Sequence, residues 1–228
     1  MSNYQNLWFK SREGLKLYAR DYVCPEPEAT IVCIPGLTRN SADFEALCEH
    51  LSKRFRVLAV DLRGRGLSEY DSDPNNYNPV VYTGDMISLL DFLNLESVIL
   101  IGTSLGGLVS MLLAAQYPGR VAGVVMNDIG PEANPEGISR IRSYVCNQHG
   151  EEDAADAFDQ LKADSGKAYT EMVFWFLDSK KASKVYPERI KTPVLVVAGS
   201  DDLIVRTPIG RATAARFEHG KFVEFWGM

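Results

Sequence analysis

The stretch Val98-Ile99-Leu100-Ile101-Gly102-Thr103-Ser104-Leu105-Gly106 carries the strongest structural signal in this 228-residue chain. Residues 98–101 form an apolar, β-branched run, and residues 105–115 are apolar nearly all round. The first run is typical of a buried strand and the second of a buried helix. Between them, residues 102–106 match the pattern G-x-S-x-G, which requires a very tight strand-to-helix turn with serine at its apex. Glycines on either side of the serine allow the strand and the helix to approach without Cβ clashes.

The same alternation of short apolar strands and helical patterns continues on both sides of this stretch. Strands are predicted at residues 30–34, 56–60, 97–102, 121–128, 194–198 and 222–226, and helices at residues 80–93, 105–115 and 207–217. Such alternation predicts the α/β class, with a mostly parallel central sheet and helices on both faces. Residues 8–10 and 15–22 flank the turn Glu13-Gly14 and predict an antiparallel hairpin at the sheet edge.

Residues 131–190 interrupt the alternation because they are charged and only patchily helical. They separate two strong strand signals, so they predict a small helical lid inserted before the penultimate strand. The predicted organisation is therefore a core at residues 1–130, a lid at 131–190 and the second part of the core, incomplete at its C-terminus, at 191–228.

Composition narrows the possible partners. The net charge is −6, the isoelectric point is near 5.2, and acids and bases are interspersed. This charge pattern argues against nucleic acid or an anionic membrane surface as partner, and favours a small-molecule ligand. No run of 18 apolar residues occurs, so no membrane insertion is expected. The N-terminus shows no secretory signal pattern, so we expect a cytoplasmic protein. The cysteines lack metal-ligand spacing, and no metal is expected; they are Cys24, Cys33, Cys48 and Cys146.

Two further motifs precede the serine in the chain, each directly after a predicted strand. Ile34-Pro35-Gly36-Leu37 follows the predicted strand at 30–34, and Asp61-Leu62-Arg63-Gly64-Arg65-Gly66 follows the strand at 56–60. With G-x-S-x-G, these motifs resemble the α/β-hydrolase superfamily over nearly the whole chain. Proline at position 35 departs from the family's usual histidine.

The resemblance implies a serine hydrolase that needs no cofactor. It implies that Ser104 is the nucleophile and that the backbone N–H groups of Leu37 and Leu105 form the oxyanion hole. The glycines of the 61–66 turn are expected to serve a sharp bend.

A serine nucleophile needs a histidine base that is oriented by a carboxylate, in the chain order serine, acid, histidine. The resemblance of Gly199-Ser200-Asp201-Asp202 to the family's G-x-x-D selects Asp202 as the acid. Asp201, its neighbour, and Asp128, at the end of the preceding strand, remain alternatives.

The chain contains three histidines, His50, His149 and His219. The first two precede Asp202, and His219 precedes the last strand rather than following it. We therefore expect a chain that is truncated before the family's histidine and final helix. An intact enzyme that uses another base is the alternative.

Two side chains are candidates for substrate binding. Arg39 lies in the loop after the predicted strand at 30–34, where it could line the substrate mouth or simply be solvated. Trp175 belongs to an apolar cluster in the predicted lid, with Met172, Phe174 and Phe176. This cluster could line an acyl pocket or pack the lid onto the core.

The sequence thus predicts an enzyme that hydrolyses a carboxylic ester or lactone through an acyl-serine intermediate, and predicts that this chain is inactive without the base. An acyltransferase, a thioesterase or a C–C bond hydrolase using the same site is one alternative. A non-catalytic ligand-binding protein is another, because fold membership does not fix function.

Overall fold

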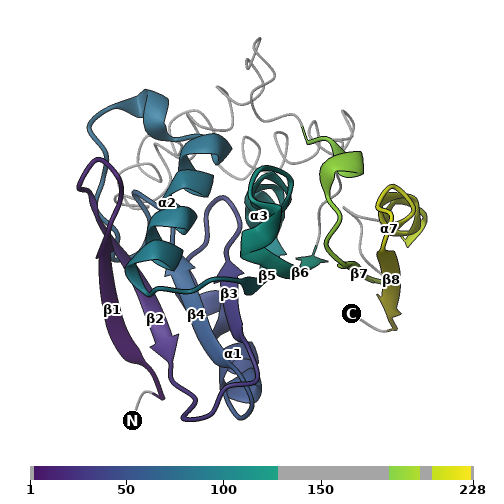
Figure 1. Cartoon of the computed structure of the whole chain (residues 1–228), viewed down its shortest axis with the longest axis horizontal. Coiled ribbons are helices and arrows are strands. Elements are labelled where there is room, and N and C mark those ends of the chain that lie inside the picture. The colour runs from purple at the N-terminus through teal and green to yellow at the C-terminus, as the bar shows by residue number, and fades with distance from the viewer. Residues whose placement is uncertain (1–2, 128–184, 201–206, 227–228) are drawn as a thin grey trace, which may run out of the picture.

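A computed structural model describes residues 3–127, 185–200 and 207–226 of the chain (Figure 1). In these residues one eight-stranded sheet has the order β1-β2-β4-β3-β5-β6-β7-β8. The strands are β1 (Gln5–Lys10), β2 (Lys16–Tyr22), β3 (Thr30–Ile34), β4 (Arg56–Asp61), β5 (Val98–Thr103), β6 (Val121–Asn127), β7 (Val194–Gly199) and β8 (Gly220–Phe225).

The sheet is mostly parallel, as the sequence predicts. β1 pairs with β2, and β2 with β4, in antiparallel fashion, and every other neighbouring pair is parallel. The antiparallel β1–β2 hairpin lies at the sheet edge and turns at Gly14, whose φ of 92° is in the left-handed region that glycine tolerates. β8 begins two residues earlier than expected and ends one residue earlier.

The described helices are α1 (Glu45–Leu51), α2 (Pro79–Phe92), α3 (Leu105–Gln116) and α7 (Thr207–Ala214). Short 3₁₀ turns are η1 (Ser41–Phe44), η2 (Pro74–Asn76), η3 (Pro118–Arg120) and η4 (Pro187–Arg189). The start of α2 shows how local sequence sets a boundary. The Asn78 side chain accepts hydrogen bonds from the N–H groups of Val80 and Val81, and Pro79 occupies the first turn, where its missing N–H costs nothing.

Helices cover both faces of the sheet, and each face has its own apolar core. On one face, residues of α2 and α3 form a core with alternate strand residues such as Val32 and Leu58, and α7 packs against β7 and β8. On the other face Phe44 and Cys48, from η1 and α1, pack over the intervening residues Cys33 and Ala59. Cys33 is buried as expected, and the pKa of its thiol is well above the usual range because of the Cys48 thiol beside it and its burial.

The chain changes direction across the sheet between β3 and β5, and this defines where a ligand can bind. From β3 the next strand, β4, lies to one side, whereas β5 through β8 follow in order on the other side (Figure 1). The connection that follows β3 and the connection that follows β5 therefore leave the sheet in opposite directions. Such a divergence opens a crevice at the carboxyl ends of the two strands, and open α/β sheets usually bind ligands there. The loop after β3 and the turn after β5 meet at this crevice. The predicted lid falls almost entirely outside the described residues.

Candidate active site

Ser104 lies at the apex of the turn between β5 and α3. Its φ of 50° and ψ of −115° are rare for a residue with a side chain, and this is one of two positive φ values outside glycine in the described residues. Hydrogen bonds hold the backbone there: the Ser104 N–H donates to Asn127 O (2.9 Å), and Ser104 O accepts from the N–H groups of Gly107 (2.9 Å) and Leu108 (3.2 Å). An unfavourable conformation that is fixed from several directions is typical of functional sites.

Two glycines allow the close packing that this turn requires. A Cβ atom built on Gly102 would lie 2.4 Å from Gly106 O, and one on Gly106 would lie 2.0 Å from Ile34 O. Such distances are far shorter than any van der Waals contact, so only glycine fits at either position. As a result, the first turn of α3 packs directly against the end of β3. The first N–H groups that bond within the helix are those of Gly107 and Leu108, so the Leu105 N–H has no partner within the helix.

The loop that follows β3, residues 35–41, lies beside Ser104. A Cβ atom on Gly36 would lie 3.7 Å from Ser104 Cβ. The Leu37 Cα is therefore within about 9 Å of Ser104 Cβ, since consecutive Cα atoms are 3.8 Å apart. Gly36 O accepts a hydrogen bond from the Arg39 N–H (3.2 Å), which closes a tight turn. We call residues 35–41 the β3 loop.

Asp61 anchors the far end of the β3 loop. Its buried carboxylate accepts hydrogen bonds from the N–H groups of Ser41 (2.7 Å) and Leu67 (2.8 Å). A Cβ atom on Gly66 would lie 2.1 Å from the same carboxylate, and the φ of Gly66 is 52°. The sharp bend expected in the 61–66 turn is therefore present, and it ties the β3 loop to the end of β4.

Arg63 fixes the same turn to the neighbouring elements. Its fully buried guanidinium donates to both carboxylate oxygens of Asp85 on α2 (2.8 and 2.6 Å), to Asp71 (2.6 Å) and to Glu13 in the β1–β2 turn (3.4 Å). Burial raises the pKa of Asp85, and the hydrogen bonds and charge of Arg63 only partly oppose this. The network joins the hairpin, the 61–66 turn and α2 into one rigid support.

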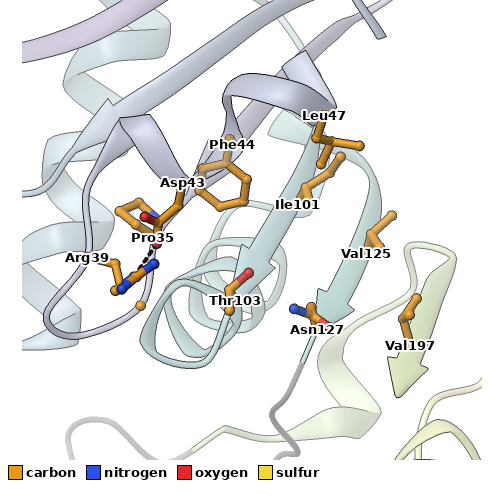
Figure 2. Close-up of a pocket in the computed structure, with 11 residues that line it drawn as sticks. Pro35, Arg39, Asp43, Phe44, Leu47, Ile101, Thr103, Val125, Asn127 and Val197 are labelled. Atoms are coloured by element: carbon orange, nitrogen blue, oxygen red, sulfur yellow. Dashed lines mark hydrogen bonds and ion pairs between the residues drawn. The ribbon is translucent and has the colours of Figure 1, made fainter. Parts of the chain in front are cut away.

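A hollow of about 520 Å³ opens on the α1 side of the sheet, next to the β3 loop (Figure 2). Its apolar wall is formed by one side chain from each of β5, β6 and β7, together with one from α1 (Figure 2). These side chains are Ile101, Val125, Val197 and Leu47. Gly36 and Thr103, which lie next to the Ser104 turn, also line the hollow, but Ser104 does not.

Arg39 also lines this hollow. Its side chain is 64% exposed and forms an ion pair with Asp43 (2.5 Å), which raises the pKa of Arg39. A Cβ atom on Gly36 would be 3.7 Å both from Arg39 Cγ and from Ser104 Cβ, so the arginine stem lies close to the serine. The guanidinium itself bonds to Asp43, whose side chain is drawn beside it in Figure 2.

The remaining predicted site residues lie outside the described part of the chain. These are Asp202, its alternatives Asp201 and Asp128, and Trp175. β6 and β7 do end at the same edge of the sheet as Ser104, because Thr103 is in register with Asn127, and Asn127 with Val197.

The two described histidines are remote from Ser104. His219 is exposed and precedes β8, and its carbonyl accepts a hydrogen bond from the N–H of Val194 at the start of β7. At about 3.3 Å per residue, His219 is roughly 20 Å from the carboxyl end of β8. His50 is exposed in the last turn of α1, shortly before β4 begins. His149 lies outside the described residues.

Comparison with known proteins identifies the family. Residues 29–142, half of the chain, match the family model described as the alpha/beta hydrolase fold, and residues 87–218 match the one described as BAAT / Acyl-CoA thioester hydrolase C terminal. A crystal structure of an α/β hydrolase from Novosphingobium aromaticivorans is 33% identical with a TM-score of 0.71, covering 99% of this chain and 91% of that one. The chain belongs to the α/β-hydrolase family.

Curated relatives match over a shorter stretch. A 3-hydroxybutyrate-oligomer hydrolase from Cupriavidus necator is 39% identical over 121 residues, 53% of this chain and 41% of the relative. A 2-(acetamidomethylene)succinate hydrolase from Mesorhizobium japonicum is 40% identical over 110 residues, 48% of this chain and 39% of the relative. The aligned stretch thus spans about 40% of the length of these relatives. An enol-lactonase structure from Burkholderia xenovorans, 24% identical with a TM-score of 0.72, covers 96% of this chain and 91% of that one, and shares the fold.

Among the described helices, none has both the length and the apolar character that crossing a membrane requires.

Proposed function

We propose that Ser104 is the nucleophile of a hydrolase that cleaves a carboxylic ester or lactone through an acyl-serine intermediate. The observation that carries this proposal is the conformation of Ser104, with φ of 50° at the apex of a turn that two tightly packed glycines make possible. A serine with only a structural role at a strand end does not need this strain. The strained turn supports the proposal because it exposes a hydroxyl above the carboxyl edge of the sheet.

In the proposed reaction the Ser104 hydroxyl attacks the substrate carbonyl carbon while a base removes its proton. The carbonyl oxygen becomes an alkoxide, which accepts hydrogen bonds from the N–H groups of Leu37 and Leu105. Each preorganised donor of this kind contributes about 3 kcal/mol to stabilising the transition state. Collapse of the tetrahedral intermediate releases the alcohol, and water then hydrolyses the acyl-serine by the same steps.

Asp202 is proposed as the acid that orients the base, with Asp128 and Asp201 as alternatives. The residue that acts as the base is not assigned, because His50 and His219 are too far from Ser104 to remove its proton. We therefore propose that the 228-residue chain alone hydrolyses esters no faster than its Ser104→Ala variant. His149 as the base would contradict this part of the proposal.

Arg39 is proposed to bind the acidic end of a substrate. It lies near Ser104, it is exposed, and two relatives are named for acidic compounds, a hydroxybutyrate oligomer and a succinate. Trp175 is proposed to contact the acyl group. With free imidazole supplied as the base, replacing Arg39 with Gln should raise KM about tenfold for an ester that bears a carboxylate, which is the effect of losing one charge-assisted hydrogen bond. A neutral ester should be unaffected. Arg54→Gln, at the similarly exposed pair with Glu28, is the matched control.

A thioester substrate is the second candidate, because residues 87–218 match an acyl-CoA thioester hydrolase family model. Acyl transfer, C–C bond hydrolysis and ligand binding without catalysis remain as further alternatives. A panel of aryl esters, lactones, acyl thioesters and diketones, assayed with the chain and with Ser104→Ala, distinguishes these classes. Free imidazole is added in a parallel series to supply a base. Imidazole-supported turnover that Ser104→Ala lacks supports the nucleophile, and the preferred substrate identifies the class. Equal rates for the two proteins on every substrate would favour a binding protein.

A further inference from the structure

Arg65 is a second buried arginine in the 61–66 turn, and its contacts differ from those of Arg63. Its side chain crosses to the β3 loop, where Nε donates to Leu37 O (2.5 Å). Nη1 donates to Arg63 O (3.1 Å) and toward the hydroxyl of Tyr82 (3.4 Å). The residue is only 2% exposed, and its guanidinium carbon lies 5.4 Å from the centre of the buried Tyr82 ring. The guanidinium thus lies between α2 and the loop beside Ser104.

The backbone of Arg65 is itself held in place. Its N–H donates to Leu62 O (3.0 Å), and its carbonyl accepts from the Ser68 N–H (3.0 Å). Leu62 and Ser68 are buried, and Ser68 also bonds to Asp61 O and to the Tyr18 N–H of β2. The contact with Leu37 therefore comes from a support that cannot move independently of the sheet.

Leu37 is held by hydrogen bonds on both of its peptide groups. The Gly36–Leu37 peptide is fixed by the hydrogen bond from the Arg39 N–H to Gly36 O, and the Leu37–Thr38 peptide by the bond from Arg65 to Leu37 O. Because trans peptides are planar, fixing a carbonyl also fixes the direction of the N–H in the same unit. The Leu37 N–H belongs to the first of these two peptides. The bond from Arg65 restrains it through Leu37 Cα, because that bond fixes the peptide plane on the other side of this atom.

We propose that Arg65 is a positioning residue for the oxyanion hole: its guanidinium holds the Leu37 peptide so that the Leu37 N–H keeps its direction toward the reacting carbonyl. The proposal rests on the proposed role of Leu37 in ester hydrolysis. Asp61 holds only the far end of the β3 loop, at Ser41, so losing the Arg65 contact leaves residues 36–38 without this restraint while the loop stays attached.

The test compares Arg65→Met and Arg65→Lys with the unsubstituted 228-residue chain. Arg56→Met is the matched control, because Arg56 is a partly buried arginine at the other end of β4 that pairs with Asp21. Amide hydrogen exchange is measured by NMR at Arg39, which reports the turn of the β3 loop, and at Val32 in the centre of β3, which reports global opening.

In Arg65→Met we expect exchange at Arg39 to rise about tenfold relative to exchange at Val32, the effect of losing one restraining hydrogen bond. Arg65→Lys, which keeps a donor, should recover part of this protection, and Arg56→Met should leave the ratio unchanged. An unchanged ratio in Arg65→Met, or equal acceleration at both amides, would overturn the positioning role and leave Arg65 as a packing residue.

The catalytic consequence is measured in imidazole-supported ester hydrolysis. We expect Arg65→Met to lower kcat by about 10- to 100-fold, as for a small misplacement of catalytic groups, with KM within threefold. A raised KM with unchanged kcat would also overturn the proposal. If the unsubstituted chain shows no Ser104-dependent turnover even with imidazole, the proposed function fails, whereas the exchange ratios still decide whether Arg65 orders the β3 loop.

Discussion

Replacing Gly106 with Ala tests the packing that creates the Ser104 turn. A Cβ atom at this position would lie 2.0 Å from Ile34 O and 2.6 Å from Ile34 C, and both are backbone atoms that no rotamer change can move. The start of α3 must therefore retreat from β3 by about 1 Å, and such overpacking costs about 1–3 kcal/mol of unfolding free energy. The same retreat carries Ser104 and the Leu105 N–H away from the β3 loop. A misplacement of about 1 Å should lower the imidazole-supported turnover about 100-fold.

Gly84→Ala is the matched control, because Gly84 also lies in a helix but a Cβ atom there would meet nothing within 4 Å. It should raise the free energy of unfolding by about 0.5–1 kcal/mol through helix propensity. Urea unfolding of the two variants should therefore give changes of opposite sign. Equal stabilisation of both variants would refute the close contact between α3 and β3, and with it the geometry assigned to Ser104.

Three further predictions concern the support network and the nucleophile. Asp85→Ala leaves the fully buried Arg63 without its bidentate partner and should lower the free energy of unfolding by about 3 kcal/mol in urea titrations; a loss below 0.5 kcal/mol would show that water compensates. Although burial acts to raise the pKa of Asp71, hydrogen bonds from Asp73 and Asn76 and the Arg63 charge lower it overall. Its contribution to stability is present above the unfolded pKa of about 3.9 and is lost as pH falls through the lower folded value. Asp71→Asn should therefore flatten the acid limb of stability below about pH 4. Ser104→Ala should leave the free energy of unfolding within about 0.5 kcal/mol of the original or raise it, because the hydroxyl makes no packing contact that the fold requires. A loss above about 2 kcal/mol would assign Ser104 a structural role.

The order of the strands and helices was predictable because hydrophobic periodicity reports burial directly. β3 matches its prediction at both ends, since all five of its residues are buried and its boundaries are set by polar or turn residues. The ends of β8 were predicted less accurately, because its half-buried residues alternate with exposed ones. A strand that is only half covered has a weaker apolar signal, and the first two residues of β8, Gly220 and Lys221, are not typical of a strand.

The tight turn at Ser104 was predictable because the G-x-S-x-G spacing, with its flanking strand and helix, is needed for a strand and a helix to pack closely at a serine. The proposed role of Arg65 could not be predicted from the sequence, because an arginine in a glycine-rich turn gives no indication of which residue its long side chain contacts. Only the structure shows that Arg65 is buried and reaches Leu37, 28 residues earlier in the chain. The position of the triad acid stays a prediction, since Asp202 and both alternatives lie outside the described residues.

The most direct test of the central claim is one rate measurement, the hydrolysis of p-nitrophenyl butyrate by the 228-residue chain minus that by Ser104→Ala, at increasing concentrations of free imidazole. The account predicts no difference without imidazole, because neither described histidine reaches Ser104, and a difference that grows and then saturates as imidazole acts as the base. Equal rates for both proteins at every imidazole concentration would contradict Ser104 as the nucleophile. A Ser104-dependent rate without imidazole would instead show that the chain supplies its own base.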